Sequence, residues 1–274
     1  MKPYYTTHPA PLTRKAALLL RRTMMLLVTI TLTLLVASGV ALAVTKIGTS
    51  DPDTLRGTHG ADNLLGKGAN DVLYALGGRD NLLGGQGKDW LMGGNQRRPF
   101  GAEGDKNMVG GSGNDGLLGG RGSDNTLGAS GNDFLNRDIG SDRAEGGQGR
   151  DLIEGWTGSD RILGQGGGDF LIHGPIEESS KHNILSGAEG EDIFLVENVP
   201  ALKDIVWCGS GFDRVVADSK DLVAEDCEKV RLVRGSRAEV LKQEETFLES
   251  LPQAERRFFD CHNFFEEQLA PFPG

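Results

Sequence analysis

The sequence has few of the side chains that build a large core or an active site. Aromatic residues make up 6% of the 274 residues and cysteine occurs three times, whereas glycine occurs 41 times. So few bulky side chains exclude a thick globular core. Neither H-E-x-x-H nor G-x-S-x-G is present, and the five histidines are scattered without metal-ligand spacing. We therefore expect a protein that is not an enzyme.

Positive charge is also scarce. The formal net charge is −10, and residues 1–43 contain five of the 29 Lys and Arg residues and no acid, so the rest of the chain carries 24 bases against 39 acids. There is no basic stripe interleaved with aromatic residues, which argues against nucleic acid as a partner. The excess of carboxylates indicates that the partner is a cation.

What the sequence does contain is a nine-residue repeat, G-x-x-G-x-D-x-(apolar)-x, which runs from Gly57 to Met92 and from Gly101 to Ile172. Aspartate occupies the sixth place in every unit but one, where Lys106 stands instead, and the eighth place is mostly apolar. Two later turns keep the same pattern. The sixth-place aspartates are Asp62, Asp71, Asp80, Asp89, Asp115, Asp124, Asp133, Asp142, Asp151, Asp160, Asp169, Asp192 and Asp213.

One unit is too short to fold alone, because a three-residue strand with one apolar side chain buries too little surface to offset its conformational entropy. Glycines at the first and fourth places allow the positive φ of tight turns, and the eighth residue points inward. Two units then make one coil, and successive coils lie about 4.8 Å apart. We therefore expect each aspartate to lie above the aspartate eighteen residues further along the chain.

Two carboxylates at that separation repel each other unless a cation lies between them. Together with the carbonyl oxygens of the turns, they offer the roughly six to eight oxygens, at about 2.3 to 2.6 Å, that Ca²⁺ prefers. Mg²⁺ demands a tighter octahedron, and Zn²⁺ prefers Cys and His ligands that these turns lack. A flexible glycine-rich linker would show neither a fixed period nor a regular apolar place. The repeat therefore predicts several bound calcium ions.

These units resemble the RTX, or haemolysin-type, calcium-binding repeats, whose consensus G-G-x-G-x-D-x-U-x is matched closely at residues 110–118 and 146–154. The resemblance implies an all-β, right-handed parallel β-roll with calcium held between neighbouring turns by aspartates and backbone carbonyls. Carried over to this chain, it implies two rows of aspartates. One row contains Asp62, Asp80, Asp115, Asp133, Asp151 and Asp169, and the other contains Asp71, Asp89, Asp124, Asp142 and Asp160.

The array departs from the family pattern at residues 93–100 (GGNQRRPF), which we interpret as a unit that is one residue short. Arg98 then stands near an aspartate place of the first row. Lys106, in the following unit, stands in an aspartate place of the second row, between Asp89 and Asp124.

A later irregular turn places His182 in an aspartate position, before an inward Ile184. Our hypothesis is that a side-chain cation replaces the metal in these irregular turns. The alternative is ordinary repeat decay with solvated side chains.

The first 43 residues have the pattern of a targeting segment, with a basic stretch ending in Arg21-Arg22 and an apolar run over residues 24–44. Cleavage after Ala43 would release a secreted protein, whereas an apolar run of about 20 residues is long enough to remain as a membrane anchor. We expect export to the extracellular side, with membrane contact only if residues 24–44 are retained.

We assign residues 44–56 to a linker, residues 57–195 to the roll, residues 196–235 to a C-terminal cap and residues 236–274 to a tail. The cap resembles the closing segment of a group of exported bacterial repeat proteins of this type. Its cysteines, Cys208 and Cys227, favour a disulfide in an exported chain. The chain-entropy model gives such a bond about 3 kcal/mol, and two free thiols are the alternative.

The tail, from Ser236, begins with a capping box and continues with apolar residues at helical spacing, which predicts a short α-helical segment. It would pack against the roll or bind a protein partner. For the whole chain we expect an exported, non-catalytic calcium-binding protein that folds on binding its metal. The alternative is a cell-surface adhesion or scaffold protein in which calcium only rigidifies the roll.

Overall fold

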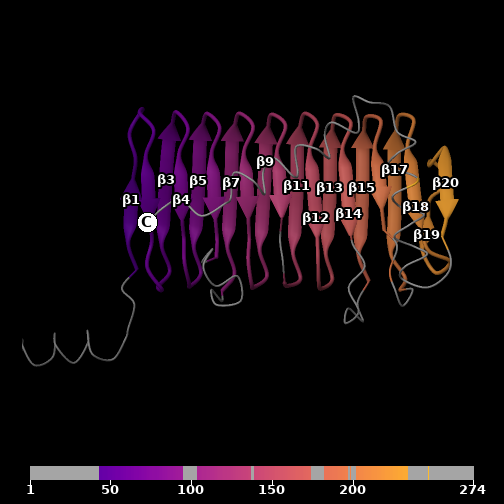
Figure 1. Ribbon diagram of the computed structural model, residues 1–274, viewed down its shortest axis with the longest axis horizontal. Helices are drawn as coiled ribbons and strands as arrows, with labels where there is room; N and C mark the ends of the chain where they lie inside the picture. Colours follow the sequence, from indigo (N-terminus) through magenta and orange to yellow (C-terminus); the bar gives the residue numbers. More distant parts are fainter. Residues whose placement is uncertain are drawn as a thin grey trace, which may run out of the picture. The chain divides into compact units, whose positions relative to one another are not determined.

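The computed structural model describes residues 43–94, 104–136, 139–173, 182–196, 198, 202–233 and 246. Within these residues, twenty β-strands form two parallel ten-stranded sheets that stack coil upon coil from β1 to β20 (Figure 1). This confirms the predicted all-β, parallel β-solenoid. The targeting segment at residues 1–42 lies outside the described residues, as does the predicted tail at residues 236–274 apart from Thr246.

Each coil contributes one strand to each sheet. Sheet A contains β1 (Thr45–Ile47), β3 (Asn63–Gly68), β5 (Asn81–Gln86), β7 (Asn107–Ser112), β9 (Asn125–Ser130), β11 (Arg143–Gln148), β13 (Arg161–Gly166), β15 (Ile184–Glu189), β17 (Ile205–Ser210) and β19 (Leu222–Val223). Sheet B contains β2 (Thr54–Arg56), β4 (Val72–Tyr74), β6 (Trp90–Met92), β8 (Gly116–Leu118), β10 (Phe134–Asn136), β12 (Leu152–Gly155), β14 (Phe170–His173), β16 (Ile193–Leu195), β18 (Arg214–Ala217) and β20 (Lys229–Leu232).

The core is a single column of eighth-place side chains enclosed between the two sheets. Leu64 pairs with Leu82, and Leu135 with Ile153, because the strands of successive coils align in register. These side chains are at most 2% exposed. With one inward side chain per strand, each coil relies on its neighbours for burial, as expected of a repeat that cannot fold alone.

The roll extends beyond the boundaries assigned from the sequence at both ends. Residues 44–56, assigned to a linker, contain β1 and β2, which pair with β3 and β4. Residues 196–235, assigned to a cap, contain β17 to β20, which continue both sheets. The first coil was missed because Asp51 stands at the fourth place of its unit, where most later units have glycine.

Residues 93–100 are not a repeat unit. The strand β6 ends at Met92, and the next strand, β7, pairs with β5 so that Asn107 lies beside Asn81. The connection from β6 to β7 is therefore lengthened, and the offset between stacked residues rises there from 18 to 26. Every aspartate that follows lies on the opposite edge from the one predicted. Arg98 lies outside the described residues.

The glycines of the turns act at different places from those expected. Positive φ occurs at the second and fourth places of the unit, as at Gly147 (122°) and Gly149 (125°), and not at the first place. Lys67 adopts the same conformation at a second place, with φ of 90°. The first-place glycine is required for another reason, which involves the neighbouring carboxylate and is described below.

The outer faces of the two sheets differ. On sheet A, the seventh-place asparagines of four coils donate side-chain hydrogen bonds to one another in a ladder, as from Asn81 Nδ2 to Asn63 Oδ1 at 2.8 Å. On sheet B the same place is apolar in the middle coils, where Phe134, Leu152 and Phe170 belong to a second buried cluster. Among the residues that the structure describes, none forms a helix with the length and apolarity needed to span a membrane.

Candidate metal centre

Two columns of sixth-place residues run along the roll. The residue just before each strand of sheet B forms the column that we call the sheet-B edge, and the residue before each strand of sheet A forms the sheet-A edge. The sheet-B edge contains Asp53, Asp71, Asp89, Asp115, Asp133, Asp151, Asp169, Asp192, Asp213 and Glu228. The sheet-A edge contains Asp62, Asp80, Lys106, Asp124, Asp142, Asp160, Asn183, Asp204 and Asp221.

All thirteen aspartates predicted from the sequence lie in these columns and are at most 4% exposed. The predicted rows were correct up to Asp89. Beyond the lengthened turn they were exchanged, since Asp115 follows Asp89 and not Asp80. Four carboxylates escaped the sequence search, because their units lack the glycines of the consensus: Asp53, Asp204, Asp221 and Glu228.

A continuous ladder of hydrogen bonds fixes the carboxylates of the sheet-B edge. The backbone N–H of each aspartate donates to Oδ1 of the aspartate in the next coil, at 2.8 Å from Asp133 to Asp151 and from Asp151 to Asp169. The same bond links every successive pair from Asp71 to Asp213. Each carboxylate is thereby held in one orientation, with Oδ2 left over.

The remaining oxygen, Oδ2, is buried and accepts no hydrogen bond from any described residue along this edge. The aspartates concerned are Asp71, Asp89, Asp115, Asp133, Asp151, Asp169, Asp192 and Asp213. A buried, unpaired carboxylate oxygen is strongly unfavourable. Eight of them in consecutive coils therefore indicate a ligand that supplies positive charge without hydrogen-bond geometry, which a hard divalent cation does.

First-place glycines leave the space around these oxygens. A Cβ on Gly110 would lie 2.5 Å from Asp115 Oδ2 and 2.9 Å from the carbonyl oxygen of Gly128 in the next coil. A side chain at this place would therefore occupy the volume between the carboxylate and the next turn. The glycine excludes that side chain, and the site keeps room for an ion.

Lys106 shows where a cation lies between two coils. Its Nζ donates to the carbonyl oxygens of Gly78 and Gly104, both at 2.7 Å, and lies 3.6 Å from Asp80 Oδ2. The lysine is thus placed against Asp80 and not against Asp89, which corrects the sequence interpretation. Its backbone N–H donates to Asp124 Oδ1 at 2.7 Å, so Lys106 stands between Asp80 and Asp124 in the sheet-A edge.

The predicted place of His182 was also wrong, by one residue. Asn183 stands in the column, where its Oδ1 accepts the backbone N–H of Asp160 at 2.8 Å. Leu185, and not Ile184, is the inward residue and is fully buried. An asparagine oxygen can continue the hydrogen-bond ladder as well as a carboxylate oxygen, although without the charge.

Along the sheet-A edge, the protein's own groups approach several Oδ2 atoms. Thr58 N–H donates to Asp62 Oδ2, Asn198 Nδ2 to Asp204 Oδ2 and Asp218 N–H to Asp221 Oδ2, at 2.5, 2.6 and 2.7 Å respectively, and His173 Nε2 lies 3.8 Å from Asp160 Oδ2. The two edges therefore differ in how much room for an ion they retain.

The family model of the RTX calcium-binding nonapeptide repeat matches this chain four times, at residues 47–73, 65–97, 100–135 and 138–171. The chain carries RTX-type calcium-binding repeats. We found no curated protein and no solved structure that matches it. The matched residues include the first coil, in agreement with the structure, and end within the coil that contains Asp169.

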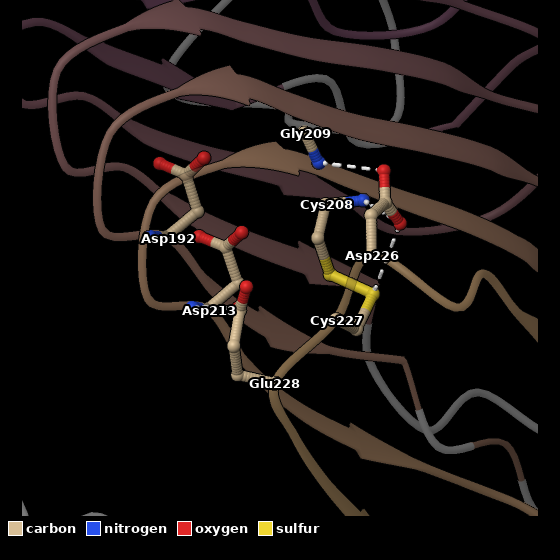
Figure 2. The surroundings of a disulfide bond; sticks show 7 residues. All are labelled: Asp192, Cys208, Gly209, Asp213, Asp226, Cys227 and Glu228. Carbon is tan, nitrogen blue, oxygen red and sulfur yellow. Dashed lines mark hydrogen bonds between the residues drawn. A yellow bond between two sulfur atoms is a disulfide. The ribbon is translucent and has the colours of Figure 1, made fainter.

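The RTX roll continues past the last matched unit and ends beside a disulfide. Cys208 and Cys227 are bonded, with their Cα atoms 5.2 Å apart, which confirms the predicted pair (Figure 2). Cys208 stands at the first place of its unit, where the other coils of this edge have glycine. The disulfide therefore attaches the last turns of the roll to the coil before them.

Acidic side chains complete the ladder at this end. Glu228 Oε2 accepts the backbone N–H of Asp213 at 2.8 Å, as an aspartate Oδ1 does in the other coils. Figure 2 shows the carboxylates of Asp192, Asp213 and Glu228 one after another beside the disulfide. Asp226 accepts the N–H of Gly209 at 3.0 Å. The longer Glu228 side chain compensates for the shorter final turn.

Burial raises the pKa of the RTX aspartates from Asp89 to Asp213 on the sheet-B edge. The pKa rises to about 7 for Asp115, Asp169 and Asp192, to about 6 for Asp133 and to about 8 for Asp151. The backbone hydrogen bond from the preceding coil lowers these pKa values in part, while neighbouring aspartates raise that of Asp151 further. Without metal, the column is therefore partly protonated near neutral pH.

We predict that Gly110→Ala removes calcium binding beside Asp115, because the added Cβ overlaps Asp115 Oδ2. Gly68→Ala is the matched control, since a Cβ at Gly68 meets nothing within 4 Å. Equilibrium dialysis with calcium should show fewer bound ions for Gly110→Ala and an unchanged number for Gly68→Ala. Equal numbers for both variants would contradict the assigned role of the first-place glycine.

We also predict a characteristic pH dependence. In the unfolded chain these carboxyls titrate near their ordinary value of 3.8, so between about pH 4 and the folded values the metal-free roll binds more protons than the unfolded chain. Its stability should therefore fall as the pH rises from 4 to 8. In chelator, the chain should therefore contain more β-structure near pH 5 than at pH 8. Circular dichroism of the metal-free protein across this pH range measures the effect, and equal β-structure at both pH values would contradict the raised pKa values.

Proposed function

We propose that this protein is an exported, non-catalytic calcium-binding protein whose repeats bind calcium between stacked turns and fold on binding. The observation that carries the proposal is the row of buried, unpaired Oδ2 atoms along the sheet-B edge. The RTX repeats supply the matching family property. On the sheet-A edge, the neighbouring residues Asp124, Asp142 and Asp160 offer the same carboxylate spacing.

Calcium fits the donor set better than other metals. Carboxylate and carbonyl oxygens are hard ligands, and the turns provide them from two coils at once. The ions would be held by the thirteen predicted aspartates, together with backbone carbonyls such as that of Gly128, which lies near Asp115 Oδ2. Affinity is expected around that of extracellular modules, about 10⁻⁴ to 10⁻³ M.

Folding on binding follows from two opposing contributions to the folding free energy, the burial of apolar side chains and the burial of carboxylates. The space between the sheets holds one inward eighth-place side chain per strand, whereas each regular coil adds two buried sixth-place residues, most of them acidic. Burying unpaired charge costs more than so thin a core can offset. Metal binding should therefore supply much of the folding free energy, as in other metal-dependent domains.

Export is supported by two separate features. The disulfide between Cys208 and Cys227 is typical of chains that fold in an oxidising compartment. Residues 1–43 have the composition of a targeting segment. Extracellular calcium, at millimolar concentration, would match sites of the expected affinity.

We predict that far-ultraviolet circular dichroism of the full-length chain will show largely disordered chain in excess chelator and β-structure after addition of millimolar calcium. A roll that is equally folded in chelator would contradict folding on binding. That result would favour the alternative of a cell-surface scaffold in which calcium only rigidifies the roll.

Asp151→Asn tests the sites themselves. Asp151 faces both Asp133 and Asp169 through the ladder, so loss of its charge should weaken two neighbouring sites and shift the calcium midpoint upward. Asp51→Asn, at an exposed residue outside both columns, should leave the midpoint unchanged. An unchanged midpoint in Asp151→Asn would contradict the assignment of these aspartates as ligands.

A further inference from the structure

Lys106 is among the largest fully buried side chains in the described part of the chain. The residue is 1% exposed, and both its side chain and that of Asp80 are inaccessible to solvent. A buried ammonium is tolerated only where oxygens replace its water. Here the carbonyls of Gly78 and Gly104 and the carboxylate of Asp80 do so.

These three oxygens recur in every regular coil. Gly78 and Gly104 occupy the fourth place of their units, and Asp80 occupies the sixth. Because the strands align in register, the corresponding atoms on the sheet-B edge are, for example, the carbonyls of Gly113 and Gly131 and Asp115 Oδ2. The ammonium therefore occupies the position that a metal ion would take in another coil.

We propose that the ammonium of Lys106 is a tethered cation that takes the place of calcium between the Asp80 coil and its own coil. This inference rests on the proposed function, because it assigns which boundary between coils does not take an ion. The sheet-A edge thus binds no calcium at this boundary, while the sheet-B edge of the same coils keeps Asp89 and Asp115 and binds it.

The charges at this boundary agree with the exchange. The ammonium of Lys106 and the carboxylate of Asp80 together carry no net charge, so no further cation is needed beside Asp80 Oδ2 at this boundary. The aliphatic part of the side chain also fits, since Lys106 Cγ would lie 3.1 Å from a Cβ on Gly93 and so fills the space that this first-place glycine leaves. The lengthened connection from β6 to β7 therefore ends at a residue that supplies its own positive charge to the sheet-A edge.

Lys106→Asp tests the proposal. Native mass spectrometry of the full-length chain in calcium should show at least one more bound ion than in the wild type, because the substitution restores the pair of carboxylates. Lys67→Asp, the same charge change at an exposed turn residue, should leave the number of ions unchanged. A wild-type chain without bound calcium would overturn the proposed function, whereas calcium binding with no extra ion in Lys106→Asp would overturn only this inference.

Lys106→Met keeps the test decisive if the aspartate variant fails to fold. Methionine preserves most of the side-chain volume but removes the charge, so Asp80 is left buried without a cation. The calcium-loaded variant should melt at a lower temperature than the wild type, whereas Lys67→Met should not. Equal melting temperatures for Lys106→Met and the wild type would contradict a tethered cation.

Discussion

The structure depends on carboxylates that are buried in register. The nine-residue period places an aspartate before most strands, and parallel pairing stacks each one on the next. The ladder from backbone N–H to Oδ1 fixes the carboxylates and leaves Oδ2 without a hydrogen bond along the sheet-B edge. The same geometry that stacks the coils therefore buries unpaired carboxylate oxygens, which are unfavourable unless positive charge lies beside them.

The two edges differ in the regularity of their carboxylates and in the groups that lie beside them. Between the described strands, the connections from β6 to β7, from β14 to β15 and from β16 to β17 are longer than in the regular coils. All three lead to the sheet-A edge, and two of them lead to a residue that is not acidic, Lys106 or Asn183. On the sheet-B edge the aspartates are continuous from Asp71 to Asp213, and the first place is glycine in every coil until Cys208. The regular edge thus retains uniform sites, while the other accommodates insertions and uses side chains of the protein near its carboxylates.

Much of the site could be predicted from the sequence because the period itself encodes it. Asp62 and Asp151 occupy the same place in their units, and their burial follows from the alternation of the strand. The edge on which Asp115 lies could not be predicted, because residues 93–100 begin with two glycines and end with Phe100, like a shortened unit. Only the pairing of Asn107 with Asn81 shows that they are an insertion.

Other features lie beyond what a pattern can show. The regular spacing of glycines within the repeat does not distinguish two roles. Gly147 stands at a place that needs positive φ, whereas Gly110 stands at a place where a Cβ would overlap a carboxylate oxygen. Asn183 was missed because the search was for charge, whereas the ladder needs only an oxygen acceptor. Glu228 was missed because a shorter turn placed it outside the period.

Anomalous diffraction from crystals of the calcium-loaded protein tests the central claim most directly. The account predicts a row of calcium ions along the sheet-B edge, one between each successive pair of aspartates from Asp71 to Asp213. Carboxylates of that edge that are stacked and ordered in millimolar calcium, with no ion between them, would contradict it.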